Sequence, residues 1–87
     1  MSKHILAVDD ETHIRRLLEV NLERAGFRVT TAVDGVDALE KIQAERPDLV
    51  ILDVMMPRKD GFSVLKELRA GAETAALPVL MLSLIHI

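Results

Sequence analysis

Residues 47–53 read Pro47-Asp48-Leu49-Val50-Ile51-Leu52-Asp53 and contain the clearest strand of the chain, which is expected over Leu49 to Leu52. A short continuous apolar run of this kind is typical of a strand that is buried on both faces of a parallel sheet. A second such run, Ile5-Leu6-Ala7-Val8, lies near the amino terminus and also leads directly into acidic residues. Two buried strands far apart in the sequence favour an α/β fold, in which helices connect the strands.

Helical patterns alternate with these runs. Apolar residues recur at helical spacing in three segments: Ile14, Leu17, Leu18, Leu22 and Ala25; Val36, Ala38, Leu39 and Ile42; and Val64, Leu65 and Leu68. Thr12 is the expected N-cap of the first helix, and Gly26 is expected just beyond its end. Arg15 and Arg16 fall off the first apolar stripe. Further strands are expected at 28–32 and 79–82. This alternation predicts an open parallel α/β sheet with right-handed crossovers.

Length and composition narrow the classes of function. The 87 residues suffice for one domain, and 49% hydrophobic residues exclude a disordered chain. A net charge of −3 without a basic run argues against direct binding to nucleic acid. The absence of cysteine excludes disulfides and thiolate metal sites. No signal peptide and no membrane-spanning run is recognisable, so we expect a soluble cytoplasmic protein that does not contact a membrane.

Acidic residues follow two of the expected strands. Asp9 and Asp10 come after the first strand, and Asp53 follows the third. In open α/β sheets, ligands bind beyond the carboxyl ends of the strands, where the strand order reverses. If these strands are neighbours, the carboxylates converge, and two of them about 4 Å apart repel by roughly 4 kcal/mol at an effective dielectric constant near 20. Such a group either has raised pKa values or binds a cation such as Mg²⁺. Acids that precede a helix also act as caps, so the pair alone does not establish a site.

The combination of segments closely resembles the receiver domain of bacterial two-component response regulators, including the chemotaxis-protein type. The resemblance is carried by Ile-Leu-Ala-Val-Asp-Asp at residues 5–10, by residues 47–57 with Asp53 and Pro57, and by Asp60-Gly61. It implies a flavodoxin-like, doubly wound parallel sheet, with a receiver domain over residues 1–83.

This resemblance also implies that the chain is the phosphoacceptor of a phosphorelay. Asp53 would take a phosphoryl group from a sensor histidine kinase or a phosphotransfer protein. Mg²⁺ would be bound by Asp10, Asp53 and the backbone carbonyl of Met55, and by Asp9 through a water molecule. Ser83 falls at the position of the hydroxyl that responds to the phosphoryl group. The domain would be a signalling module rather than an enzyme, assisting its own phosphorylation and dephosphorylation, and a C-terminal output domain outside this chain is compatible with it.

Two other functions stay open at this point. The first is an Mg²⁺-dependent phosphatase or phosphotransferase with an Asp nucleophile, although such enzymes usually place that residue after the first strand. The second is a binding-only member of the family that is never phosphorylated. The intact acids Asp9, Asp10 and Asp53 argue against this second alternative.

The sequence departs from a complete receiver near its end. Receivers have five strands and five helices, whereas four strands and three helices are expected here, so the last helix, strand and helix are expected to be missing. With them goes a functional Lys, and no Lys or Arg follows Arg69. The last six residues, Leu82 to Ile87, match the translation of a transposon-end adapter used in sequencing libraries. We therefore expect residues 84–87 to be non-native and phosphorylation-dependent switching to be impaired.

Overall fold

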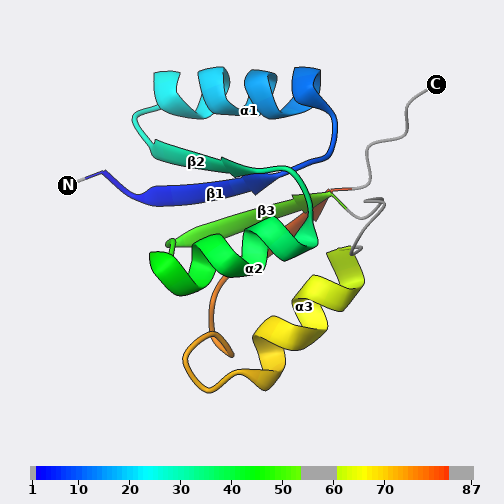
Figure 1. The fold of residues 1–87 in the computed structure, drawn as a ribbon. Helices are drawn as coiled ribbons and strands as arrows, with labels where there is room; N and C mark the ends of the chain where they lie inside the picture. The colour runs from blue at the N-terminus through cyan, green and yellow to red at the C-terminus, as the bar shows by residue number, and fades with distance from the viewer. Residues whose placement is uncertain (1, 54–60, 83–87) are drawn as a thin grey trace.

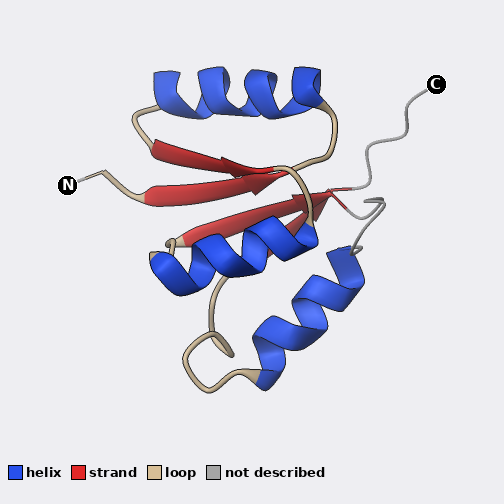
Figure 2. Cartoon of the chain, in the orientation of Figure 1, coloured by secondary structure: helices blue, strands red, loops and turns tan. Residues whose placement is uncertain are grey.

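The structure, a computed structural model, describes residues 2–53 and 61–82 of the chain. The elements follow one another as β1 (His4–Val8), α1 (Thr12–Arg24), β2 (Arg28–Ala32), α2 (Gly35–Ala44), β3 (Leu49–Asp53), α3 (Gly61–Ala70) and β4 (Val79–Leu82) (Figure 1). All strand pairs are parallel, and the strand order is β2-β1-β3-β4. The alternation of helices and strands is visible in Figure 2. The expected open parallel α/β fold is therefore confirmed.

The strand order reverses between β1 and β3. From β1 the chain first adds β2 on one side and then places β3 on the other side. Val8 at the end of β1 pairs with Leu52 of β3, so the two strands end next to each other. In an open α/β sheet this is the position where ligands bind.

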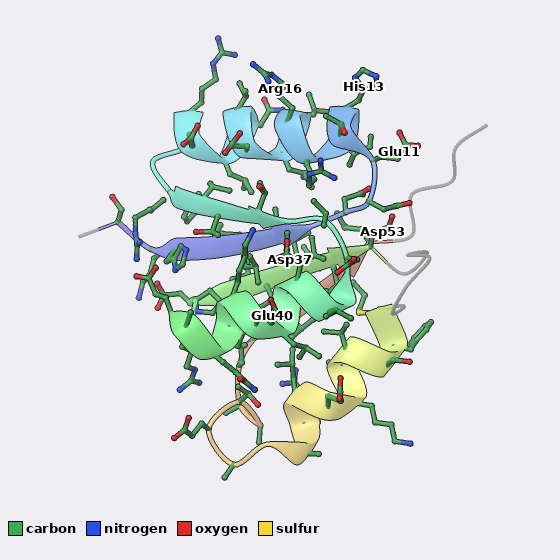
Figure 3. All side chains as sticks on the ribbon, viewed as in Figure 1. Glu11, His13, Arg16, Asp37, Glu40 and Asp53 are labelled. Atoms are coloured by element: carbon green, nitrogen blue, oxygen red, sulfur yellow. The ribbon has the colours of Figure 1, made fainter. Side chains whose placement is uncertain are left out.

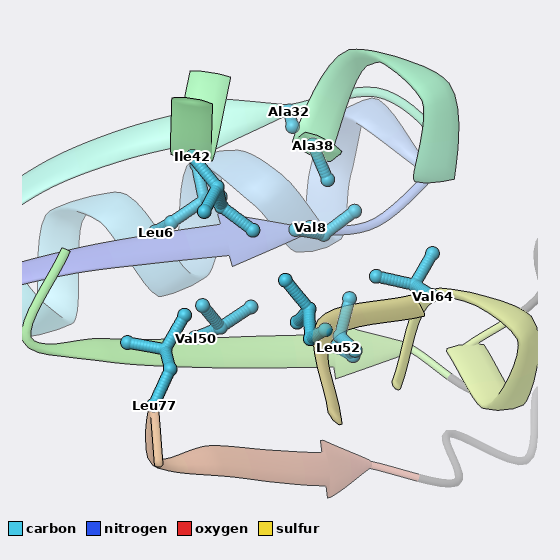
Figure 4. Packing of buried hydrophobic residues seen from close by; sticks show 10 residues of the cluster. Leu6, Val8, Ala32, Ala38, Ile42, Val50, Leu52, Val64 and Leu77 are labelled. Carbon is cyan, nitrogen blue, oxygen red and sulfur yellow. The ribbon is translucent and has the colours of Figure 1, made fainter. Parts of the chain in front are cut away.

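The hydrophobic core lies between the sheet and two of the helices. Helices α2 and α3 cover one face of the sheet, and α1 lies on the other (Figure 1). Ten buried residues fill the space beneath α2 and α3 (Figure 4): Leu6, Val8, Ala32, Ala38, Ile42, Val50, Leu52, Val64, Leu68 and Leu77. Burial of these side chains fixes the positions of β1 and β3, the strands that lead into the acidic residues.

The packing of α1 is weaker than the sequence pattern indicates. No residue of this helix is fully buried. Leu17, expected on the buried stripe, is 58% exposed, and Val20 is 45% exposed. Ala25 is also exposed and lies at the C-cap, after the last helical residue. The helix packs over β2 and β1, and no second helix among the described residues lies beside it on this face, so one flank of its apolar stripe contacts solvent.

The two ends of α1 differ in how well the sequence predicts them. Thr12 was expected as the N-cap, which is wrong, because Glu11 has that position and Thr12 is the first helical residue. The prediction for Gly26 is confirmed, since its φ of 99° is a conformation that favours glycine. The N–H of Gly26 donates to the carbonyl of Glu23, and the N–H of Phe27 donates to that of Leu22. This pair of hydrogen bonds is a Schellman motif, which satisfies the last carbonyls of the helix.

Several of the expected features lie outside the described residues. They are the carbonyl of Met55, the Ser83 hydroxyl, and the tail at 84–87. Within the described ranges, no helix has the length and apolar character that crossing a bilayer requires.

Candidate functional site

The register of the strands brings together the acidic residues at the carboxyl ends of β1 and β3. Val8 and Leu52 are opposite each other in the parallel pair of β1 and β3. Asp9 and Asp53 each follow one residue later, so their side chains leave the sheet at the same edge. Figure 3 shows Asp53 at the carboxyl end of β3. The expectation that these acids converge is confirmed.

The site consists of three carboxylates that differ in exposure. Asp9, Asp10 and Asp53 each have a carboxylate oxygen that lies within 4.8 Å of the corresponding atoms of the other two. Asp9 and Asp53 are buried, with 1% and 3% of their surface exposed. Asp10 is exposed to solvent. The group therefore has a buried side, formed by two strand ends, and an open side that a partner or ligand can approach.

The loop that carries Asp9 is held by hydrogen bonds from three directions. The Asp9 N–H donates to the carbonyl of Ala32 on β2 at 3.2 Å. The Asp9 Oδ1 atom accepts a hydrogen bond from the N–H of Glu11 at 2.8 Å, a local turn that Asp residues commonly form. Arg15 donates to the Asp9 carbonyl at 2.9 Å. The remaining polar atom, Oδ2 of Asp9, is buried and has no hydrogen-bond partner within the described part of the chain.

This environment changes the protonation of Asp9. Burial raises the pKa of its carboxyl group from 3.8 to about 6, the hydrogen bond from Glu11 opposes the change, and the charges of Asp53 and Asp10 add to it. A buried acceptor without a donor is costly, and two more carboxylates nearby increase that cost. Both effects are relieved by a cation placed among the three groups.

The donor set fits a hard divalent cation. Carboxylate oxygens are the ligands that Mg²⁺ and Ca²⁺ prefer, and Mg²⁺ in particular is held by one or two carboxylates while it keeps several waters. The Asp9 Oδ2 atom is an acceptor in need of a positive partner, and the exposed Asp10 leaves the group accessible. The residues present thus fit Mg²⁺, as expected from the sequence.

Sequence reasoning missed one residue at this site. Arg15 was assigned to the polar side of the first helix, yet it is partly buried and contacts the acidic loop. The signal that could have found it is its position, because a residue in the first turn of α1 reaches back over the loop that precedes the helix. Two histidines lie within the described residues, and neither is part of the acidic group. His4 is buried against Thr30, and His13 is exposed.

Comparison with known proteins gives a consistent family match. Residues 5–86 match the family described as "Response regulator receiver domain". The chain is 52% identical over 83 residues to the alkaline phosphatase synthesis transcriptional regulatory protein PhoP of Bacillus subtilis, covering 95% of this chain and 34% of that protein. It is 47% identical over 83 residues to response regulator MprA of Mycobacterium ulcerans, covering 95% of this chain and 35% of the relative. The chain thus spans about a third of the length of these relatives.

Solved structures agree with the sequence comparison. The N-terminal domain of a response regulator receiver protein from Methanoculleus marisnigri superimposes with a TM-score of 0.92 and 40% identity, over 98% of this chain and 69% of that one. The chemotaxis response regulator CheY4 of Vibrio cholerae gives a TM-score of 0.89 and 41% identity, over 93% and 68%. The four strands and three helices described here thus correspond to about two thirds of each of these chains.

Proposed function

Because this chain belongs to the response regulator receiver domain family, we propose that it is a phosphoacceptor module in which Asp53 receives the phosphoryl group. One observation carries this proposal: Asp53 is buried at the carboxyl end of β3, and its carboxylate lies within 4.8 Å of two further carboxylates. A structural acid at a strand end would have no need of such neighbours, because their charges oppose its ionisation.

The transfer needs a nucleophile and a leaving group. A carboxylate oxygen of Asp53 attacks phosphorus while the bond from phosphorus to the donor breaks. That bond is to an imidazole nitrogen in a phosphohistidine and to an oxygen in an acyl phosphate. The electron pair of the broken bond remains on the donor atom, and Asp53 becomes an acyl phosphate. The short β3 strand, paired on both sides, holds the attacking group in a fixed position.

A divalent cation belongs at the same site. We assign its direct binding to Asp10, Asp53 and the carbonyl of Met55, with Asp9 bound through water. Met55 lies outside the described residues, and its part rests on the family resemblance alone. Bound Mg²⁺ supplies positive charge to the phosphoryl oxygens during transfer. The orphaned Asp9 Oδ2 supports this proposal, since it is an acceptor that a metal-bound water could satisfy.

The response to phosphorylation is assigned to Ser83, whose hydroxyl would turn toward the phosphoryl group; this residue also lies outside the described ranges. These 87 residues contain no Lys or Arg after Arg69. By themselves they therefore offer no later cation to pair with a phosphoryl group. We propose that they accept this group more readily than they transmit its presence, because a two-state change requires contacts that differ between the states.

The proposed phosphoryl donor is a sensor histidine kinase or a phosphotransfer protein. Its active histidine would approach the open side of the site at Asp10. The first relative is named a transcriptional regulatory protein, and this chain spans 34% of its length. We propose that binding to DNA, where it occurs, belongs to an output segment and not to these 87 residues. Their net charge of −3 opposes contact with phosphates.

The test is the intact mass after incubation with acetyl phosphate and Mg²⁺. We expect a gain of one phosphoryl group. This gain should not occur when Mg²⁺ is chelated before the incubation, and it should be absent in Asp53→Ala. The exposed residue Glu73 provides a matched control, and Glu73→Ala should be phosphorylated like the original protein. A gain that persists in Asp53→Ala would refute the assignment. Steady turnover of a phosphomonoester would favour the phosphatase alternative, and no modification under any condition would favour a binding-only module.

A further inference from the structure

We propose that Arg15 is a positioning residue for divalent cation binding, because its guanidinium fixes the peptide that joins Asp9 to Asp10. This inference rests on the proposed function, since it concerns the same metal site. It assigns a role to a side chain on α1 that contributes no ligand atom. Arg15 reaches the acidic loop with one donor and Thr12 of α1 with another, whereas Arg16 makes no hydrogen bond to the loop among the described residues.

The guanidinium of Arg15 connects the loop to the helix. Its Nη1 atom donates to the Asp9 carbonyl at 2.9 Å, and its Nη2 atom donates to the Thr12 hydroxyl at 3.3 Å. The fork of an arginine side chain is planar and rigid, so two simultaneous hydrogen bonds restrict its orientation. Arg15 thereby links Asp9, the first residue of the loop, to the first turn of α1.

The carbonyl that Arg15 contacts determines how two of the three acids are arranged. The Asp9 carbonyl and the Asp10 nitrogen belong to one planar peptide unit, so fixing the carbonyl direction fixes the plane. The orientation of that plane sets the direction in which the Asp10 side chain leaves the backbone relative to that of Asp9. Asp10 is exposed, and no hydrogen bond of its own side chain is found among the described residues. Its position therefore depends on the backbone, of which the peptide plane held by Arg15 is a part.

The charge of Arg15 also acts on Asp37, in the first turn of α2. Burial opposes ionisation of Asp37, but the N–H of Val33, Lys41 and the charge of Arg15 together hold the pKa of this carboxyl below its ordinary value. Asp37 lies in the first turn of α2 and accepts a hydrogen bond from Val33. The charge of Asp37 thus attracts the guanidinium of Arg15, while its two hydrogen bonds, to Asp9 and Thr12, direct the side chain at the site.

Positioning and simple charge have opposite effects on affinity. A cationic side chain close to a metal site repels the metal, so removing it should tighten binding if charge alone matters. If Arg15 positions the acids, removing it should weaken binding. The choice of cation separates the two effects further, because Mg²⁺ requires nearly ideal octahedral geometry whereas Ca²⁺ accepts irregular ligand arrangements. Loss of positioning therefore lowers affinity for Mg²⁺ more than affinity for Ca²⁺.

The experiment compares Arg15→Met with Arg16→Met by calorimetric titration with Mg²⁺ and with Ca²⁺. Arg16 lies on the outer side of α1 in Figure 3 and has no hydrogen bond or ion pair among the described residues, so its variant makes the same change in charge without loss of the contact. We expect Arg15→Met to raise the Kd for Mg²⁺ about tenfold relative to Arg16→Met, with a smaller rise for Ca²⁺. Arg15→Lys keeps the charge and one donor, and should restore part of the Mg²⁺ affinity.

Each other result has a definite meaning. Equal Mg²⁺ to Ca²⁺ affinity ratios in Arg15→Met and Arg16→Met would overturn the inference and leave the metal site intact. If the unsubstituted protein binds neither cation, or if Asp10→Asn does not change binding, the proposed function fails instead. Urea unfolding shows whether each variant is folded. If Arg15→Met is not folded, Arg15→Lys is compared with Arg16→Lys, which keeps the charge constant. Equal ratios of Mg²⁺ to Ca²⁺ affinity in these two variants would overturn the inference.

Discussion

Asp9 combines near-complete burial with an incomplete set of hydrogen bonds. Its side chain is 1% exposed, one carboxylate oxygen has no partner among the described residues, and its pKa is raised to about 6. In the unfolded chain the same group titrates near 3.8. The folded state therefore favours the protonated form, and this contribution to stability is present below pH 4. It is lost as the pH rises through about 6.

The first prediction follows from the direction of this pH dependence, in which the Asp9 carboxyl group costs stability above pH 6. In the absence of divalent cations, Asp9→Asn should raise the free energy of unfolding at pH 7.5 by up to roughly 3 kcal/mol, because asparagine resembles the protonated acid. The Asn Oδ1 atom can still accept the hydrogen bond from Glu11. At pH 4 the variant and the original protein should have nearly equal stability. Urea unfolding at the two pH values measures the difference.

Magnesium provides the control for this prediction. An ion that binds only the folded state stabilises it by about 2.7 kcal/mol at one hundred times its Kd. Adding Mg²⁺ should therefore stabilise the original protein and leave Asp9→Asn less affected, reducing or reversing the difference at pH 7.5. A variant that is less stable than the original at pH 7.5 without metal would contradict the assigned cost of the buried carboxylate.

At the scale of elements, the strands were predicted more closely than the helices. The boundaries of β2 and β4 agree with expectation at both ends, and those of β1 and β3 differ by one residue. Continuous apolar runs identify such strands because both of their faces are covered. The exposure of Leu17 and the contact of Arg15 could not be predicted, since both depend on which neighbours surround α1 in space. For the same reason, sequence reasoning identified the acids but not the residue that holds their loop.

The second prediction concerns the strand β4. Among the described residues this strand lies at the edge of the sheet, its four residues carry no charge, and Leu80 is 50% exposed. Exposed edges of this kind promote association with other chains, and a lysine on such a strand suppresses it. Leu80→Lys should therefore reduce self-association at little cost in stability, as measured by light scattering at increasing concentration.

Leu17→Lys on α1 is the matched control, because Leu17 is exposed to a similar degree but lies on a helix. If pairing of strand edges causes the association, the substitution in β4 should have the larger effect. Equal effects of the two substitutions would show that exposed apolar area, and not the open edge of β4, determines self-association.

At the scale of the whole molecule, the two faces of the sheet are covered unequally. The described residues place α2 and α3 on one face, with the main buried cluster beneath them. The other face carries α1, which has no fully buried residue. The expected flavodoxin-like receiver fold, incomplete over these residues, is thus confirmed in its topology, and its main buried apolar cluster lies on one side of the sheet. Burial of apolar area is the main source of stability, so α1 should be the less stable layer.

The last prediction tests this asymmetry by amide hydrogen exchange. Amides in β3, such as those of Val50 and Leu52, should exchange only on global unfolding, because both residues are fully buried. Amides in the middle of α1 should exchange through a local opening. Its free energy should be lower than the free energy of global unfolding by at least roughly 1 kcal/mol. Helix α2 is the internal control, since it buries Ala38 and Ile42 and should be protected better than the longer α1. Equal opening free energies in α1, α2 and β3, together with a sharp cooperative melt of a monomer, would mean that the two layers unfold as one unit. The apolar contacts of α1 would then be sufficient despite the exposure of Leu17.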